Sequence, residues 1–432
     1  MHQPRVVTGR EVDAVVSLLG TLVAPADSIP LLDHADEVSQ WAASGAMALT
    51  GRREGPPLAA PVGFVSRVRW IESLLWPWLD VAGAPSLDVL ALLGERAAIA
   101  GFERNGTTSC GGTTRLLQAS DGWVALSLTR PEDVAAVPAL FDGDVTDDPW
   151  QSVTAAVATR RAHELLARAA LLGVPMSGLG ESAARQAPNV TELGSMSPAA
   201  TLSGVLVVDL SSLWAGPLCA HVLGLAGATV VKVESVLRPD GARNGPTAFF
   251  DLLHNGHDCV AVDLTTSLGV TQLVSLLDRA DVVIEASRPR ALAQLGISPE
   301  RVASTGRLRA WVSITGHGRT GDAAMRVAFG DDAAVSGGLV AYEGNEPRFL
   351  ADAIADPLTG VVATVGVLRA LMSGRRVLLN VSMAGVAAAF SGIASAAATP
   401  FVENPRARVA RSSARSLGAD NNRWLTEARR ST

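Results

Sequence analysis

One carboxylate stands out because of the residues that follow it. Asp356 precedes a run of small and branched apolar residues, 357–368, that contains no charged residue. We expect this run to form a buried helix, which would place Asp356 at the mouth of a dry cavity. A buried carboxylate without a partner is costly, so it needs a role, either as a reactive group or as a helix cap. Asp is a preferred N-cap, and Pro357 suits the first helical position, so the local sequence leaves both roles open.

Size and composition indicate a globular protein of more than one domain. The 432 residues exceed what one hydrophobic core usually holds. Apolar residues make up 48% and charged residues 18%, which is typical of folded chains. The 36 basic residues are outnumbered by 42 acidic ones, and aromatic residues make up 4%. We therefore expect no nucleic-acid partner, because neither a basic surface nor a base-stacking platform is indicated.

The cysteines and histidines show no metal or disulfide pattern. The three cysteines lack CxxC spacing and the seven histidines lack HExxH spacing, so we expect no metal. The N-terminal sequence MHQPRVVTGREVDAVV lacks the apolar core of a signal peptide. The apolar run at 381–399 is mostly Ala, Gly and Ser, which favours a buried helix over a membrane span. These patterns predict a cytoplasmic protein without a membrane partner.

The order of the expected elements predicts an α/β fold: a doubly wound parallel (Rossmann-like) sheet plus a smaller α+β domain. Five buried-strand patterns alternate with helical segments, at 204–210, 229–235, 259–264, 281–287 and 308–316. We place this domain at 202–396 and the smaller domain at 1–184, with a hairpin at Asp121-Gly122. Residues 185–201 are expected to be a linker, and 397–432 a C-terminal segment.

Ligands of doubly wound sheets bind beyond the carboxyl ends of the strands. Those ends carry polar or small residues here: Asp209, Glu234, Asp263, Ser287 and Gly316. The first strand-to-helix turn, 211–217, lacks GxGxxG, so a nicotinamide-dependent reductase is disfavoured.

Two segments of the chain share one pattern. Residues 43–75 and 335–368 both read as small residues, a turn, a proline, an apolar segment and a helix. In this alignment Asp356 lies opposite Val65 or Ser66. We expect the second copy to be chemically active and the first to have lost that activity.

The region 203–390 resembles the class III CoA-transferases, the group of formyl-CoA/carnitine CoA-transferases and alpha-methylacyl-CoA racemases. The resemblance is carried, in order, by LSGVLVVDLSSLWAGPLCAHVLGLAGATVVKVES, CVAVDL, DVVIEASRP, ALAQLGISPE, VSITGHGRTG and the SGG and ADP segments. The first half resembles a later portion of the family, through SGAMALTG, TTSCGGTT, TRLLQASDGWVALSL and LGVPMSG. Small-domain-like material thus precedes the nucleotide-type domain, as in a permuted chain or a truncated tandem.

The resemblance implies a nucleophilic role for Asp356, because residues 356–360 fit the family's Asp-x-x-[ST]-Gly pattern. Asp356 would attack an acyl-CoA thioester to give a mixed anhydride and then an aspartyl-CoA thioester, which an acceptor carboxylate resolves. The family's shielding loop falls on Ser109, Cys110, Gly111 and Gly112, which could also be an ordinary connector. The resemblance also implies contacts with CoA at Trp214, Ala215, Val262, Asp263, Leu264, Thr265, Ala286, Ser287, Arg288 and Asp332. These positions could instead be ordinary loops at the ends of the strands.

Several positions depart from the family pattern. Ser235, the segment 254–258 and Gln294 stand where the family has basic residues, so we expect Arg288, Arg290 or Lys232 to hold the CoA phosphates. The racemases have His followed by Asp where this chain has Asp331-Asp332, so alpha-proton exchange lacks its imidazole.

We therefore expect an enzyme that moves CoA from an acyl-CoA to a small carboxylic acid. Coenzyme A would be its only cofactor, and the family implies a homodimer. An acyl-CoA racemase or epimerase and a catalytically silent CoA-binding relative are the alternatives.

Overall fold

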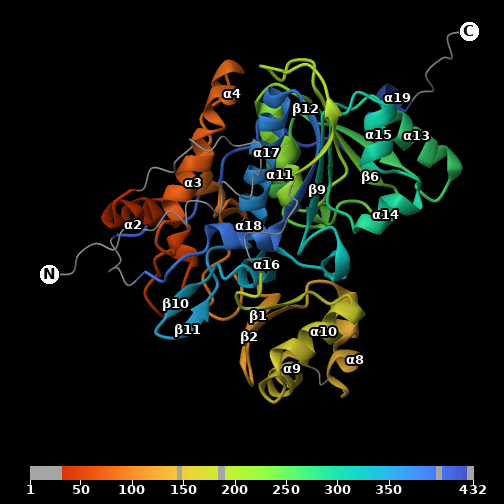
Figure 1. The fold of residues 1–432 in the computed structure, drawn as a ribbon. Coiled ribbons are helices and arrows are strands. Elements are labelled where there is room, and N and C mark those ends of the chain that lie inside the picture. The colour runs from red at the N-terminus through yellow and green to blue at the C-terminus, as the bar shows by residue number, and fades with distance from the viewer. Residues whose placement is uncertain (1–31, 144–147, 183–189, 396–400, 426–432) are drawn as a thin grey trace, which may run out of the picture.

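A seven-stranded sheet lies at the centre of the computed structural model, which describes residues 32–143, 148–182, 190–395 and 401–425 (Figure 1). The strand order is β4 (Val190–Ser195), β12 (Arg375–Ser382), β9 (Ala310–Thr315), β8 (Val282–Glu285), β5 (Leu206–Asp209), β6 (Thr229–Ser235) and β7 (Asp258–Val262). From β12 to β7 all neighbours pair in parallel, whereas β4 pairs antiparallel with β12. The parallel strands are runs of apolar residues, as expected for a sheet buried on both faces.

Helices cover both faces of this sheet. On one face α11 (Ala215–Leu225), α17 (Ala355–Ser373) and α18 (Met383–Phe390) share a core with side chains such as Val207 and Val312. On the other, α13 (Ser267–Leu277) and α15 (Pro299–Thr305) share a core with Val208 and Val283. Successive residues of one strand thus point into different cores. The predicted fold class, a doubly wound parallel sheet, is confirmed.

A smaller α+β part lies at one end of the molecule (Figure 1). Its antiparallel sheet has the order β1 (Thr114–Ala119), β2 (Gly122–Ser127) and β3 (Met176–Gly178). The helices that accompany it are α7 (Pro131–Ala135), α8 (Val137–Phe141), α9 (Pro149–Ala158) and α10 (Ala162–Leu172). The predicted hairpin is confirmed, with Ala119 paired to Gly122 across the turn.

The helices nearest the N-terminus pack on the same side of the sheet as α17 (Figure 1). They are α2 (His34–Ala43), η2 (Met47–Leu49), α3 (Phe64–Ser73), α4 (Trp76–Val81), α5 (Val89–Leu92) and α6 (Glu95–Ala100). Trp41, Phe64 and Phe390 stack edge to face, with ring centroids 5.4 and 6.2 Å apart, which joins α2 and α3 to α18. The remaining elements are η3 (Gly241–Asn244), α12 (Thr247–His254), α14 (Pro289–Gln294), η4 (Gly321–Met325), α16 (Gly330–Ser336), β10 (Ala341–Glu343), β11 (Glu346–Arg348) and α19 (Asn421–Trp424).

Segments on both sides of the parallel strands take part in the large sheet. The expected linker at 185–201 supplies β4, so part of it is a sheet strand. The C-terminal segment is fastened to β7: Asp420 Oδ2 accepts the Cys259 N–H at 2.8 Å, and the Asn421 amide bonds both backbone groups of Ala261. The domain boundaries stay predictions. The expectation that the N-terminal sequence lacks a signal peptide concerns residues outside the described ones.

The two similar segments both end in a helix, α3 for 43–75 and α17 for 335–368. Of the two residues expected opposite Asp356, Val65 is buried, and Ser66, in the first turn of α3, donates its hydroxyl to Glu37 Oε1 at 2.7 Å. Neither residue carries a carboxylate; the correspondence of the two segments stays a prediction.

Helix α17 is the longest helix of the described residues. It is long and apolar enough to cross a membrane, but 83% of its most apolar window is buried inside the protein, as in a core helix. It lies directly against α11: a Cβ added at Gly360 would be 2.6 Å from the Ala215 carbonyl oxygen and 3.0 Å from Leu218 Cβ. Glycine at 360 thus allows the two backbones to approach closely.

This contact predicts different outcomes for two Gly→Ala changes on one helix. Gly360→Ala should lower the free energy of unfolding by about 1–3 kcal/mol, because backbone cannot move aside easily. Gly366→Ala is the matched control, since its Cβ would meet only the end of the Leu379 side chain, at 3.1 Å. The control should stay within about 1 kcal/mol of the wild type. Urea unfolding measures both, and equal effects would contradict the close packing.

Candidate active site

Asp356 occupies the first turn of α17 and is partly exposed. The helix begins after Ile354, its N-cap, and has no side-chain capping bond. Of the two roles left open by the local sequence, the cap is therefore not observed. Within the described residues, the Asp356 carboxylate has no hydrogen-bond partner, although its position near the helix N-terminus favours an anion. A carboxylate in this state is available for a ligand.

Three more carboxylates lie around Asp356. Asp331 and Asp332 are in the first turn of α16, and Asp352 lies just before α17; all three are buried. Asp331 Oδ1 accepts the Ala353 N–H at 3.0 Å. Asp332 accepts the Phe329 N–H at 2.9 Å and the hydroxyls of two strand serines, Ser127 at 2.8 Å and Ser177 at 3.4 Å. These two carboxylates hold backbone and strands in place.

An arginine from the first half of the chain completes the cluster. Arg96 in α6 donates from Nε to Asp352 Oδ2 at 2.8 Å and from Nη2 to Oδ1 at 2.6 Å. Its guanidinium also lies over the ring of Trp214, 5.2 Å from the centroid, and near that of Phe102, at 5.8 Å. Trp214, an expected CoA contact, is thereby joined to the carboxylate cluster.

Burial and like charges keep protons on this cluster. Burial raises the pKa of Asp356 to about 7; Arg96 opposes this rise, and the carboxylates of Asp331, Asp352 and Asp332 add to it. Burial also raises the pKa of Asp331 to about 6 and that of Asp332 to about 7. Near neutral pH, Asp356 therefore divides between acid and anion.

The backbone packs unusually closely around the Asp356 carboxylate. A Cβ added at Gly330 would overlap both the Asp356 carboxylate and the Ala353 carbonyl oxygen, so only glycine fits there. Ala351 and Ala353 have φ of 52° and 43°, the left-handed region that non-glycine residues rarely adopt. Such conformations persist where the surroundings enforce them and often occur at functional sites.

The expected shielding loop, residues 109–112 and here called the glycine loop, lies against the turn at 351–353. The Cys110 thiol points to the Ala351 carbonyl at 3.3 Å and to the Leu49 carbonyl at 3.6 Å. Ser109 accepts the Thr114 N–H at 3.2 Å, Gly111 lies beside Phe102, and Gly112 has φ of 80° with open space around it. Burial raises the pKa of the Cys110 thiol, so it is neutral at physiological pH. The structure places this loop against Ala351, in the turn that precedes Asp356; its shielding role stays a prediction.

The expected CoA contacts fall into separate groups. Ala215 lies at the start of α11 against α17, next to Trp214. Val262, Asp263, Leu264 and Thr265 follow β7, where Asp263 accepts the N–H and hydroxyl of Thr265 at 3.0 and 2.6 Å. Ala286, Ser287 and Arg288 follow β8, where Ser287 donates to Glu285. Two strands separate β7 from β8, so only Trp214, Ala215 and the fully buried Asp332 lie at the carboxylate cluster.

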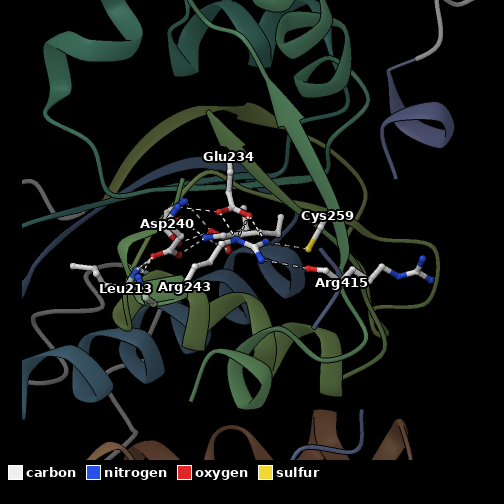
Figure 2. Close-up of polar contacts among 10 residues, drawn as sticks. Leu213, Glu234, Asp240, Arg243, Cys259 and Arg415 are labelled. Carbon is white, nitrogen blue, oxygen red and sulfur yellow. Dashed lines mark hydrogen bonds and ion pairs between the residues drawn. The ribbon is translucent and has the colours of Figure 1, made fainter. Parts of the chain in front are cut away.

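Lys232, one of the three cations expected to hold phosphates, is unsuited to that role. It is fully buried, 2.9 Å from Asp240 and 3.6 Å from Asp209. Asp240 also accepts the Leu213 N–H at 3.0 Å, and Arg243 pairs with Glu234 at 2.6 Å beside Cys259 (Figure 2). These pairs fix the loop after β6. Arg238 and Arg288, which follow β6 and β8, and Arg290 at the start of α14 are exposed, and their guanidinium groups have no hydrogen bond or ion pair among the described residues.

Sequence reasoning missed Arg96, Asp352 and the pairing of Lys232. Arg96 is a charged residue in a helical segment that also carries Glu95, so its sequence gave no distinct signal. Among the described residues, no group of His, Cys, Asp or Glu has the arrangement of a metal site.

Comparison with known proteins identifies relatives of the second half. The model of CoA-transferase family III matches residues 202–419. A "probable fatty acyl-CoA transferase" of Mycobacterium tuberculosis is 34% identical over 194 residues, 41% of this chain and 48% of that protein. Succinyl-CoA–D-citramalate CoA-transferase of Chloroflexus aurantiacus is 28% identical over 194 residues, 43% of this chain and 48% of that protein. The chain thus spans about half the length of the curated relatives it matches.

Solved structures give a weaker likeness. A CAIB/BAIF family protein from Brucella suis is 28% identical, with a TM-score of 0.41, over 44% of this chain and 55% of that one.

The raised pKa of Asp356 predicts how stability depends on pH. A carboxyl that binds its proton more tightly when folded stabilises the fold at low pH, and this contribution is lost as pH rises toward 7. Asp356→Asn should therefore gain stability relative to the wild type between pH 4.5 and 8, by up to about 1.4 kcal/mol per pH unit. Asp263→Asn is the control: hydrogen bonds from Thr265 lower the pKa of Asp263, so its titration lies below this pH window and its stability relative to the wild type should not change with pH between about 4.5 and 8. Unfolding midpoints across pH measure both, and a relative loss for Asp356→Asn at pH 8 would contradict the burial.

Proposed function

This chain belongs to CoA-transferase family III, and from that premise we propose that it moves CoA from an acyl-CoA to a carboxylic acid, with Asp356 as nucleophile. The observation that carries the proposal is the state of Asp356. Its carboxylate has no partner among the described residues, lies near the N-terminus of a buried helix and titrates near neutrality. A structural carboxylate would be paired or hydrogen-bonded, as Asp331, Asp332 and Asp352 are.

The reaction follows from these groups in four balanced steps. The Asp356 anion attacks the thioester carbonyl, and the C–S bond breaks to give an anhydride and CoA thiolate. The thiolate then attacks the Asp356 carbonyl, which releases the donor carboxylate and leaves an aspartyl-CoA thioester. The acceptor carboxylate attacks this thioester, forming a second anhydride and freeing the thiolate again. The thiolate finally attacks the acceptor acyl carbonyl, which gives the new acyl-CoA and restores Asp356.

The electrostatics of the cluster suit this chemistry. A carboxylate whose pKa is near 7 is more basic than an ordinary aspartate, and so more nucleophilic, yet still partly ionised at neutral pH. An anhydride hydrolyses in water, so the contact of the glycine loop with residues 351–353 would serve to exclude water.

CoA would approach from the carboxyl ends of the strands, where Arg238, Arg288 and Arg290 are available for its phosphates. Burial lowers the pKa of Arg288, and the neighbouring Arg290, Arg130 and Arg238 lower it further, which indicates a concentration of positive charge. An anion would relieve that repulsion. We take acyl-CoA and small carboxylic acids as the substrates, the homodimer as the assembly and the cytoplasm as the location, and sedimentation velocity tests the assembly.

Hydroxylamine tests the covalent step. With an acyl-CoA and hydroxylamine present, the wild type should accumulate a hydroxamate on Asp356, identified by peptide mass spectrometry. Asp356→Asn should form none, and Asp356→Glu should form it at least about a hundredfold more slowly, because the carboxylate is displaced. Absence of any adduct across short, branched and dicarboxylic acyl-CoAs would favour the silent CoA-binding relative instead.

Calorimetry with CoA tests the arginines separately. Arg288→Met should weaken CoA binding about tenfold, as expected for one lost charge-assisted phosphate contact, and should reduce the salt dependence of binding. Arg406→Met, an exposed arginine paired with Glu403 on another surface, is the matched control and should bind CoA like the wild type. Unchanged affinity for Arg288→Met would place the phosphates elsewhere.

A further inference from the structure

The segment before Asp356 has a conformation that its own sequence does not favour. Ala351 and Ala353 lie in the left-handed region on both sides of Asp352. Neither residue is a glycine or asparagine, so local preference opposes this turn. The turn leads directly into the first residues of α17 and therefore sets where the Asp356 side chain points.

Four contacts hold the turn, and three of their partners come from the first half of the chain. Thr50 Oγ1 accepts the Ala351 N–H at 3.0 Å, and the Cys110 thiol donates to the Ala351 carbonyl at 3.3 Å. Asp331 accepts the Ala353 N–H at 3.0 Å. The fourth contact, between Arg96 and Asp352, is the only charged pair of the set and the only bidentate one.

We propose that Arg96 is a positioning residue for Asp356: it holds the 351–353 turn through Asp352 and supplies the positive charge that keeps Asp356 available as an anion. The inference rests on the proposed nucleophilic role of Asp356. Nothing in the family-matched region 202–419 supplies this group, because Arg96 belongs to α6.

The arginine is itself fixed on several sides. Its neighbour Glu95 pairs with Arg408 at 2.6 Å, which anchors the start of α6. The rings of Trp214 and Phe102 lie near the Arg96 guanidinium. These rings constrain the orientation of the guanidinium plane, and the bonds to Asp352 fix its position. Such a fixed guanidinium acts on a site with little cost of reorganisation.

The charges that face Asp356 give the expected sign. Asp331 and Asp332 from α16 and Asp352 from the turn disfavour the anion, Arg96 from α6 favours it, and the Cys110 thiol of the loop is neutral. Removal of the Arg96 charge should therefore raise the pKa of Asp356 further. An opposite charge nearby typically lowers a carboxyl pKa by about 1–3 units. If the pKa of Asp356 rises by one unit, the anion fraction at pH 7 falls from about one half to about one tenth.

The test measures Asp356 directly and does not depend on turnover. In protein labelled with ¹³C at the Asp carboxyl groups, the Asp356 signal is assigned by its loss in Asp356→Asn and titrated by NMR. Arg96→Gln should move the midpoint upward by at least about one unit, whereas Arg96→Lys, which keeps the charge, should leave it within about half a unit. Arg309→Met is the control: Arg309 pairs with the buried Asp281 before β8, away from the carboxyl ends of the strands. An unchanged midpoint in Arg96→Gln overturns the proposal.

The hydroxylamine reaction gives the second readout. The rate of adduct formation in Arg96→Gln should follow the displaced midpoint, with its pH profile shifted to higher pH. If Arg96→Gln does not fold, Arg96→Lys serves as the test. Lysine cannot make both bonds to Asp352, so adduct formation should slow at least tenfold while the titration midpoint of Asp356 stays unchanged. A wild-type rate of adduct formation in Arg96→Lys would overturn the proposal. A wild type that forms no adduct refutes the proposed function, while the NMR titration still tests Arg96.

Discussion

The close approach of α17 to α11 is the contact on which the site depends. Gly360 has no side chain to separate the helix from the Ala215 carbonyl, so the two backbones meet one turn after Asp356. The same helix is enclosed by the sheet and by the N-terminal helices, which leaves it little freedom to shift. Gly330 then allows α16 to meet the Asp356 carboxylate from the other side. Two positions without a Cβ thus determine where a partly exposed acid lies.

Burial, more than any single partner, decides the electrostatics of this acid. Four carboxylates share a small region with one arginine, and three of the four are enclosed by protein. Full ionisation of all four would leave several uncompensated charges in a poorly solvated place. Asp331, Asp332 and Asp356 therefore retain protons to near neutral pH, while Asp352 makes the ion pair with Arg96.

The sequence predicted what periodicity and local chemistry control. The five strands, the helices between them and the β1–β2 hairpin follow from apolar runs and from Asp121-Gly122, so they could be located in advance. Asp356 was identifiable because a charge before a long apolar run is locally anomalous. Arg96 was not, since its partner Asp352 is 256 positions away and nothing local distinguishes it. Lys232 was misjudged for the same reason: whether a cation faces solvent or a buried carboxylate depends on the assembled sheet.

The two outermost parallel strands of the large sheet, β12 and β7, each bond to a segment from outside the parallel set. β4 pairs with β12, and it carries Glu192, a charged residue of the kind that discourages further pairing. On the other side, the residues of 420–421 bond to the backbone of β7 much as another strand would. A fragment cut to 202–396 would keep the parallel strands but expose unpaired backbone groups on both of them. Such a fragment would tend to associate with itself through added strands, so solubility as well as chemistry depends on the flanking segments.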